Sequence, residues 1–218
     1  MACCHTVITF EDYIPVFLMF ILNTLGIFTF PIMAYLIVEG YHKTSNIKKY
    51  IFRLFFFGLL SSFPSYLLNG RLSVMFTLLY GLISLFLWNY TTNKVLFWLC
   101  FSGMIILSIF SDWSIIGVPL IFMYGTIKGE KRRIILSTVI ILIIGLVIVG
   151  ILAILRYGWS KQLALDSVQM LAGIFVIPLL LSYNSKRGYS RPSLKYLFYI
   201  FYPAHFLILY GLKWLIEK

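Results

Sequence analysis

Long apolar stretches separated by short groups of charged residues are the feature that most constrains this chain. They lie at about residues 13–38, 50–69, 72–90, 95–111, 113–127, 134–155, 163–182 and 196–216. A helix that crosses a bilayer needs about 20 mainly apolar residues, and most of these stretches are long enough. The shorter stretches at 95–111 and 113–127 predict either two thin or tilted spans or a re-entrant pair. We therefore predict an all-α integral membrane protein, a single polytopic bundle of about eight transmembrane helices.

The composition leaves no room for a second domain. Of the 218 residues, 61% are hydrophobic and only 11% are charged, whereas about a quarter of the residues in a soluble domain are charged. An extramembrane catalytic domain of ordinary size would need about 100 residues or more. Residues 1–218 are thus predicted to form one membrane domain, and any chemistry must use residues in or beside the bilayer.

The basic residues alternate between the two sides of the predicted bundle. One side holds Lys43, Lys48, Lys49, Arg53, Lys94, Lys128, Lys131, Arg132, Arg133, Lys186, Arg187, Arg191 and Lys195, and the other holds Arg71, Arg156, Lys161, Lys213 and Lys218. Short cytoplasmic loops are enriched in Lys and Arg. This predicts a multi-pass protein of the cytoplasmic membrane with both termini outside. Orientation in the lipid bilayer also accounts for the net charge of +11, so we expect no nucleic-acid partner.

Several common signatures are absent from the sequence. There is no Walker phosphate loop, dinucleotide glycine fingerprint, His-Glu-x-x-His or Gly-x-Ser-x-Gly motif, which disfavours primary pumping and zinc proteolysis. Cys3, Cys4 and Cys100 are odd in number and the adjacent pair is poorly placed for a bridge, so we expect no disulfide and no metal. Residues 1–12 carry no basic residue, and we expect the first apolar stretch to be retained as a span.

Ionisable residues within or beside the apolar stretches are the candidates for function, because burying a charge in a bilayer costs at least about 2.5 kcal/mol. They are Glu39, Arg53, Asp112, Asp166 and His205, with His5 at the outer edge. His205 lies well inside the last stretch, and Pro203 favours a kink beside it. Because histidine exchanges protons near neutral pH, His205 is predicted either to carry proton transfer or to be hydrogen-bonded between helices.

The other candidates also have plain structural interpretations. Asp112 lies between two short stretches, where a plain turn aspartate is expected more often than a functional one. Glu39 ends the first stretch and is expected to cap that helix or pair with nearby basic residues. Arg53 is expected to extend its side chain back to the cytoplasmic interface. Asp166 begins the seventh stretch and is expected to lie at the membrane–water interface.

Five segments together resemble a known family. They are residues 25–41, 76–81, 112–117, 183–188 and 195–205. The first contains Phe30-Pro31 and ends in Glu39-Gly40-Tyr41, and it is followed by His42, Thr44, Asn46, Lys49, Tyr50, Arg53 and Leu54. The last ends in Tyr202-Pro203-Ala204-His205. This combination, over about residues 25–212, is similar to the TraX family of integral membrane acetyltransferases, named for a conjugation protein that acetylates the amino terminus of pilin. Two positions depart from the family pattern: Cys4-His5 stands where members have Asp-His, and Gly26-Ile27 where they have Gly-Arg.

The resemblance implies transfer of an acetyl group from acetyl-coenzyme A to an amine or hydroxyl of a polypeptide or an envelope glycan. Lys43, Lys48, Lys49 and Arg53 are the predicted cations for the phosphates of the donor. The predicted base is His205 or, second, His5, and Asp112 is predicted to orient or neutralise an imidazolium.

Two other interpretations stay open at this point. A small secondary transporter or flippase is also a bundle with a few buried charges, although no inverted repeat is evident. A catalytically inactive membrane assembly factor fits the two departures from the family pattern.

Overall fold

A computed structural model describes residues 2–10, 13–157, 161–184 and 194–216, and the regular elements within them are helices. They are α1 (Ala2–Thr9), α2 (Val16–Lys43), α3 (Ile47–Asn69), α4 (Val74–Tyr90), α5 (Lys94–Ser108), α6 (Ser114–Thr126), α7 (Glu130–Tyr157), α8 (Lys161–Ala172), the 3-10 turn η2 (Gly173–Phe175), α9 (Val176–Leu181) and α10 (Leu194–Ile216). Each predicted apolar stretch thus contains helix, and α1 is an additional short helix before them.

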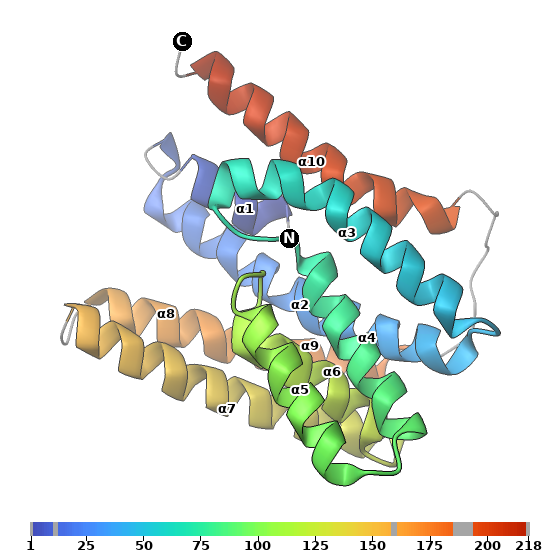
Figure 1. Ribbon diagram of the computed structural model, residues 1–218. Coiled ribbons are helices and arrows are strands. Elements are labelled where there is room, and N and C mark those ends of the chain that lie inside the picture. Colours follow the sequence, from blue (N-terminus) through green and yellow to red (C-terminus); the bar gives the residue numbers. More distant parts are fainter. Residues whose placement is uncertain (1, 11–12, 158–160, 185–193, 217–218) are drawn as a thin grey trace.

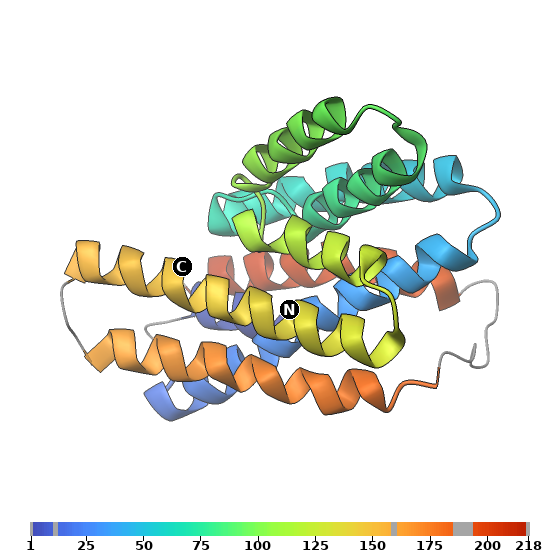
Figure 2. The same ribbon diagram turned by 90° about the horizontal axis from the view of Figure 1, so that it is seen from below.

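Successive connections lie at opposite ends of the bundle (Figures 1 and 2). The loops that follow α2, α4 and α6 gather at one end, which we call the basic end (residues 43–49, 91–94 and 126–133). The turns that follow α3 and α5 lie at the other end, which we call the turn end (residues 69–73 and 108–114, with α1). The basic loop at 185–193 that the sequence assigns to the first of these ends falls outside the described residues.

Polar side chains define where the helices begin and end. The side chains of Asn46, Ser73 and Asn93 accept hydrogen bonds from the first backbone N–H groups of α3, α4 and α5, groups that have no partner within the helix. At the end of α3, Gly70 adopts a left-handed conformation with φ of 64°, which only glycine reaches without strain. These caps explain why α3, α4 and α5 begin within a few residues of the predicted boundaries, and why α3 ends at Asn69.

Close approach of helices depends on small residues. A Cβ atom at Gly81 of α4 would lie 2.5 Å from a methyl group of Ile121, and one at Gly117 of α6 would lie 2.4 Å from Thr77. At Gly103 of α5, by contrast, a Cβ atom would meet nothing within 4 Å. The core is therefore centred on α4 and α6, and α5 packs on its edge.

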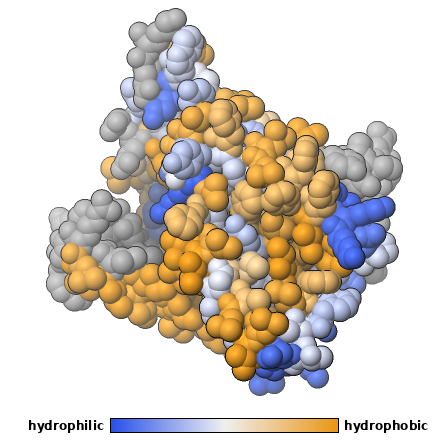
Figure 3. Space-filling model, in the orientation of Figure 1, coloured by the Kyte–Doolittle hydropathy of each residue, from blue (hydrophilic) through white to orange (hydrophobic). Residues whose placement is uncertain are grey.

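Apolar side chains cover much of the outer surface. Figure 3 shows hydrophobic residues over most of one face, with hydrophilic residues in a few patches. Phe17, Phe52 and Leu155 are 77%, 66% and 78% exposed, an arrangement expected of a surface in contact with lipid rather than water. Among the described residues three helical segments are long and apolar enough to cross a membrane: Val16–Lys43, Ile47–Asn69 and Tyr199–Ile216. The chain is a helical membrane protein.

Three sequence predictions need correction or refinement. The count of eight spans is not confirmed, because within the described segments only those three helices meet the length and composition of a span. The stretch at 163–182 is not one helix, since η2 interrupts it between α8 and α9. The stretches at 95–111 and 113–127 form separate helices of 15 and 13 residues. At 1.5 Å per residue the shorter is about 20 Å long, less than the thickness of a typical hydrocarbon core.

Candidate functional site: a buried histidine–aspartate cluster

Asp112 is held by two turns that are bonded to each other. The backbone N–H of Leu72 donates to the carbonyl of Phe110 at 2.8 Å, and the N–H of Asp112 donates to the carbonyl of Leu72 at 3.2 Å. The hydroxyl of Thr77 donates to the carbonyl of Asp112. Trp113 has a φ of 63°, and its ring stacks on Phe30 at 4.6 Å. Asp112 is thus a turn aspartate, as one interpretation of the sequence held, and it is also fixed within the bundle.

Helix α1 brings His5 to this aspartate because α1 packs directly on α2. A Cβ atom at Gly26 of α2 would lie 1.8 Å from Sγ of Cys4, so only glycine allows this approach. A cavity of about 170 Å³ remains between the two helices and the turn that follows α5; it is lined by Cys4, His5, Ile8, Gly26, Asp112 and Trp113.

We expect Gly26→Ala to displace α1 and to lower the stability of the fold by about 1–3 kcal/mol, the usual cost of overpacking. The measurements are thermal unfolding in detergent and maleimide labelling of Cys4 in a background in which Cys3 and Cys100, the other two free cysteines, are replaced by serine. Gly103→Ala is the matched control, because its Cβ atom meets nothing within 4 Å. Gly26→Ala protein that unfolds and labels like the control would contradict the packing of α1 on α2.

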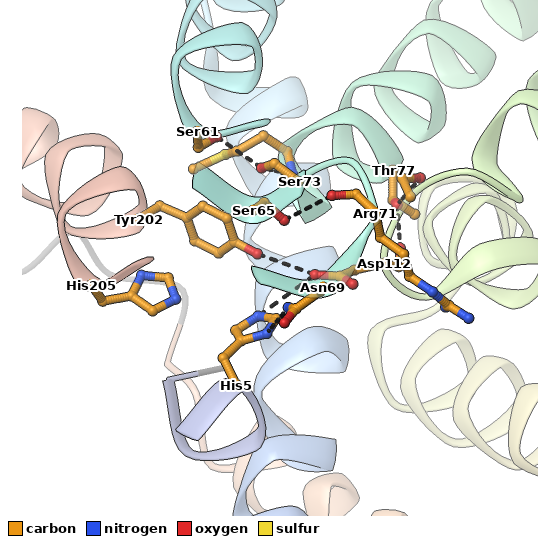
Figure 4. Close-up of polar contacts among 12 residues, drawn as sticks. His5, Ser61, Ser65, Asn69, Arg71, Ser73, Thr77, Asp112, Tyr202 and His205 are labelled. Atoms are coloured by element: carbon orange, nitrogen blue, oxygen red, sulfur yellow. Dashed lines mark hydrogen bonds and ion pairs between the residues drawn. The ribbon is translucent and has the colours of Figure 1, made fainter. Parts of the chain in front are cut away.

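His5 makes contacts to three different elements in the interior (Figure 4). Its side chain is almost fully buried, at 4% exposure. Nδ1 lies 2.9 Å from Nδ2 of Asn69, the last residue of α3. Nε2 lies 3.6 Å from Oδ2 of Asp112, an electrostatic contact longer than a hydrogen bond. The His5 ring also lies 5.5 Å from that of His205 on α10.

Helix α10 contributes two further polar groups to the cluster. The Tyr202 hydroxyl donates to Oδ2 of Asp112 at 3.5 Å, and Tyr202 is 2% exposed. One helical turn later, Nδ1 of His205 lies 3.1 Å from the carbonyl oxygen of Phe201. Nε2 of His205 is buried and makes no hydrogen bond within the described part of the chain. This nitrogen is therefore a buried polar group whose hydrogen-bonding capacity is unused by the described residues.

Burial favours the neutral forms of both ionisable groups at the turn end, so it moves their pKa values in opposite directions. Burial, and then the neighbouring charge of His205, lower the pKa of His5 to about 3. Burial raises the pKa of Asp112 to about 6, although the charge of Arg71 and the Tyr202 hydroxyl act to lower it. Near neutral pH, His5 is therefore neutral and Asp112 is mainly ionised.

These two shifts predict how stability depends on pH. Because the pKa of His5 is far below its ordinary value of 6.5, its contribution to stability is present above pH 6.5 and is lost as the pH falls toward 3. The raised pKa of Asp112 acts oppositely: its contribution is present below the ordinary value of 3.8 and is lost as the pH rises through about 6. We expect His5→Gln to weaken the loss of melting temperature between pH 7.5 and 5, and Asp112→Asn to steepen it.

The control for this pH series is His42→Gln. His42 is exposed, and partial burial and the charge of Arg133 lower its pKa, so its replacement should reduce the loss on acidification less than His5→Gln does. The measurement is thermal unfolding in detergent at each pH. A His5→Gln variant that loses as much stability on acidification as the unmodified protein would contradict the burial of a neutral imidazole.

The predicted donor-binding residues lie at the basic end, far from this cluster. Lys43 and Arg53 line a cavity of about 450 Å³ together with Glu39, Tyr50 and Tyr183. Lys48 and Lys49 are exposed on the first turn of α3, and the described lining of this cavity does not include them. The structure therefore gathers two of the four predicted cations around one cavity.

An ion pair that sequence reasoning missed anchors this end. Arg133 of α7 contacts Glu39 of α2 at 2.6 Å and donates to the Tyr35 hydroxyl at 2.9 Å. Glu39 also pairs with Lys43 at 3.0 Å, as expected from its basic neighbours. The side chains of Arg133 and Glu39 are only 15% and 11% exposed. Arg133 stands 94 residues from Glu39 along the chain, so spacing carries no signal of this pair.

The structure thus brings together His5, Asp112 and His205, which the sequence singled out at three distant positions. Their catalytic roles stay predictions. Sequence reasoning missed Asn69 and Tyr202 as members of the cluster; Tyr202 stands one helical turn before His205, and that spacing could have indicated it. The side chain of Asp166 lies outside the described residues.

These features define a class: a helical membrane protein with a buried histidine–aspartate cluster at one end and a cation-lined cavity at the other. A family model described as TraX protein matches residues 1–213, and this chain belongs to the TraX family. The chain is also 26% identical over 212 residues to a probable fimbrial assembly protein, FimC of serogroup H1, from Dichelobacter nodosus; the match covers 90% of this chain and 84% of the relative. No solved structure matches the chain.

Proposed function

We propose that this protein transfers an acetyl group from acetyl-coenzyme A to an amine or hydroxyl acceptor at the membrane. The observation that carries the proposal is the buried contact of His5, Asp112 and His205, in which Nε2 of His205 has no protein partner among the described residues. A buried imidazole with a free ring nitrogen is suited to general base catalysis. Membership of the TraX family, whose resemblance implied acetyl transfer, supports the same reaction.

The reaction requires one proton acceptor and one stabilised oxyanion. The nucleophilic nitrogen or oxygen of the acceptor attacks the thioester carbonyl, forms the new N–C or O–C bond, and gives its proton to His205. The C–S bond then breaks, and the coenzyme A thiolate leaves with that proton. The products are the acetylated acceptor and coenzyme A, and both the histidine and the aspartate return to their starting states.

We further propose that the donor enters from the basic end and that this end faces the cytoplasm, with both termini outside. Lys43 and Arg53 then hold phosphates of acetyl-coenzyme A. From Glu39, beside this cavity, to Gly26, beside His5, is 13 residues of α2, or about 20 Å at 1.5 Å per residue. An extended phosphopantetheine arm is of a length to bridge such a distance and deliver the thioester to the cluster.

The relative described as a fimbrial assembly protein supports a pilus-related role. We therefore propose a polypeptide acceptor, the amino terminus of a fimbrial subunit, ahead of an envelope glycan. Transfer to such an acceptor would modify a protein as it crosses or leaves the membrane.

Labelled acetyl-coenzyme A tests the proposal directly. The purified protein in vesicles is given a membrane-anchored peptide with a free amino terminus, and the control peptide carries a blocked one. We expect label only in the free peptide, and only when the donor is on the side of the basic end. Absence of label in peptide, lipid and glycan fractions would overturn the enzymatic proposal.

The donor site carries its own prediction. We expect Arg53→Met to raise the KM for acetyl-coenzyme A about tenfold, because a hydrogen bond to a charged group is worth about 1.5–3 kcal/mol, and to leave kcat nearly unchanged. The exposed Lys48 and Lys49 attract the donor at longer range, so their replacement by methionine should have a smaller effect that disappears at high salt. Lys131→Met is the control at the same end. An unchanged KM in Arg53→Met would exclude this cavity as the donor site.

A further inference from the structure

The two histidines of the cluster have different kinds of partner, and the partners determine which ring nitrogen carries the proton. Nδ1 of His205 faces the carbonyl oxygen of Phe201 at 3.1 Å. A carbonyl only accepts hydrogen bonds, so Nδ1 of His205 is the protonated nitrogen. In the neutral ring, Nε2 of His205 then carries a free lone pair.

His5 has the reverse arrangement. Its Nδ1 lies 2.9 Å from Nδ2 of Asn69, and an amide nitrogen only donates, so Nδ1 of His5 is the acceptor. The proton of the neutral ring is then on Nε2, which faces Oδ2 of Asp112 at 3.6 Å. The opposite orientation of the Asn69 amide would leave a nitrogen lone pair facing a carboxylate oxygen, which is repulsive. Two separate contacts therefore agree on the Nε2–H form of His5.

The position of Asn69 is itself well defined. It ends α3 immediately before Gly70, whose N–H donates to the carbonyl of Tyr66 at 2.9 Å. Ser65, one turn earlier in α3, donates to the carbonyl of Arg71 at 3.0 Å. These bonds close the end of the helix on both sides of Asn69, so its side chain is presented to His5 by a rigid turn.

We infer that His205 and His5 have different roles, base and hydrogen-bond donor, and that Asn69 is the positioning residue that holds His5 in its Nε2–H form. This inference rests on the proposed function. Nε2 of His205 takes the proton of the attacking nucleophile. The Nε2–H of His5 lies 3.6 Å from Oδ2 of Asp112 and makes no hydrogen bond there, so it donates one to the thioester oxygen as negative charge develops on that oxygen. The His5 proton is shared and not transferred, and the proton on His205 passes to the departing thiolate.

Nitrogen-15 NMR of histidine-labelled protein in detergent identifies the protonated nitrogen of each ring, and it does so whether or not the protein is enzymatically active. The chain has three histidines, and His42→Gln leaves only the two in question. At pH 8 we expect a protonated Nε2 on His5 and a protonated Nδ1 on His205. Asn69→Asp, whose carboxylate accepts from Nδ1–H, should reverse the His5 tautomer, and Asn69→Leu should leave a mixture, both without change at His205. A Nδ1–H form of His5 in the unmodified protein would overturn the inference.

Kinetics of the same variants test the role of Asn69 in transfer. We expect Asn69→Asp and Asn69→Leu to lower kcat at least tenfold with little change in the KM for acetyl-coenzyme A. The matched control is Asn89→Asp, since Asn89 of α4 likewise donates through Nδ2 to a ring side chain, the Tyr41 hydroxyl at 2.7 Å. Unchanged kcat in a variant whose His5 tautomer is reversed would overturn the role of Asn69. The expected tautomers in a protein with no transferase activity would instead overturn the proposed function.

Discussion

Replacing His205 with glutamine is expected to lower the rate of acetyl transfer by about 10²–10⁴-fold, the range typical of a lost general base. Glutamine approximates the size of the ring and retains hydrogen-bonding groups but has no basic nitrogen near neutral pH. His205 is 7% exposed, and its Nε2 makes no hydrogen bond in the described chain. The effect should fall on kcat, because the proton moves only in the transition state.

A structural role for His205 gives a different result. Its ring contacts those of Phe201, Tyr202 and Phe206, so a packing residue would show a lowered melting temperature with normal activity in the folded fraction. Specific activity is therefore measured on purified, monodisperse protein, beside a melting curve. His42→Gln is the control for loss of an exposed histidine. Normal specific activity of His205→Gln would shift the base to His5.

Replacing Arg133 with alanine is expected to lower the free energy of unfolding by about 3–5 kcal/mol, the usual cost of removing one partner from a buried ion pair. The substitution leaves the carboxylate of Glu39 buried without its closest cation, at 2.6 Å. It also removes the donor to the Tyr35 hydroxyl. Lys43 still pairs with Glu39, but the Lys43 side chain is 52% exposed, and an exposed ion pair compensates only weakly. We therefore expect the lower half of that range.

Arg132→Ala is the matched control, because Arg132 is the exposed neighbour of Arg133. Stability is measured by reversible denaturation in mixed micelles. The double variant Glu39→Gln with Arg133→Met removes both charges and should recover most of the loss. Equal stability of Arg133→Ala and Arg132→Ala would show that the pair does not tie α2 to α7.

Sequence pattern alone placed the helices, because the length of an apolar stretch is a local property. The stretch at 50–69 became α3 (Ile47–Asn69), and that at 72–90 became α4 (Val74–Tyr90). The pattern failed where the backbone changes within an apolar run: nothing in the hydropathy of 163–182 indicates the 3-10 turn at Gly173–Phe175.

The candidate site followed partly from sequence. Charged and basic groups are so costly in a bilayer that each one in an apolar stretch is conspicuous, and this was enough to select His5, Asp112 and His205. Lys43 and Arg53, which line one cavity, were selected on a different ground, as cations for the acetyl-coenzyme A that the family resemblance implied. The exposed positions of Lys48 and Lys49 depend on which face of α3 packs inward, and that was not visible from charge alone.

Tertiary structure alone decided which of these groups meet and what each one faces. Asn69 and His5 stand 64 residues apart, and Arg133 and Glu39 stand 94 apart. A polar side chain such as Asn69 at the end of an apolar helix looks the same whether it caps that helix or orients an imidazole. Asn69 meets the imidazole of His5 only because α1 packs against Gly26 and the turns at 69–73 and 108–114 are hydrogen-bonded to each other. Hydrogen bonds and burial depend on distances in space and not on position along the chain.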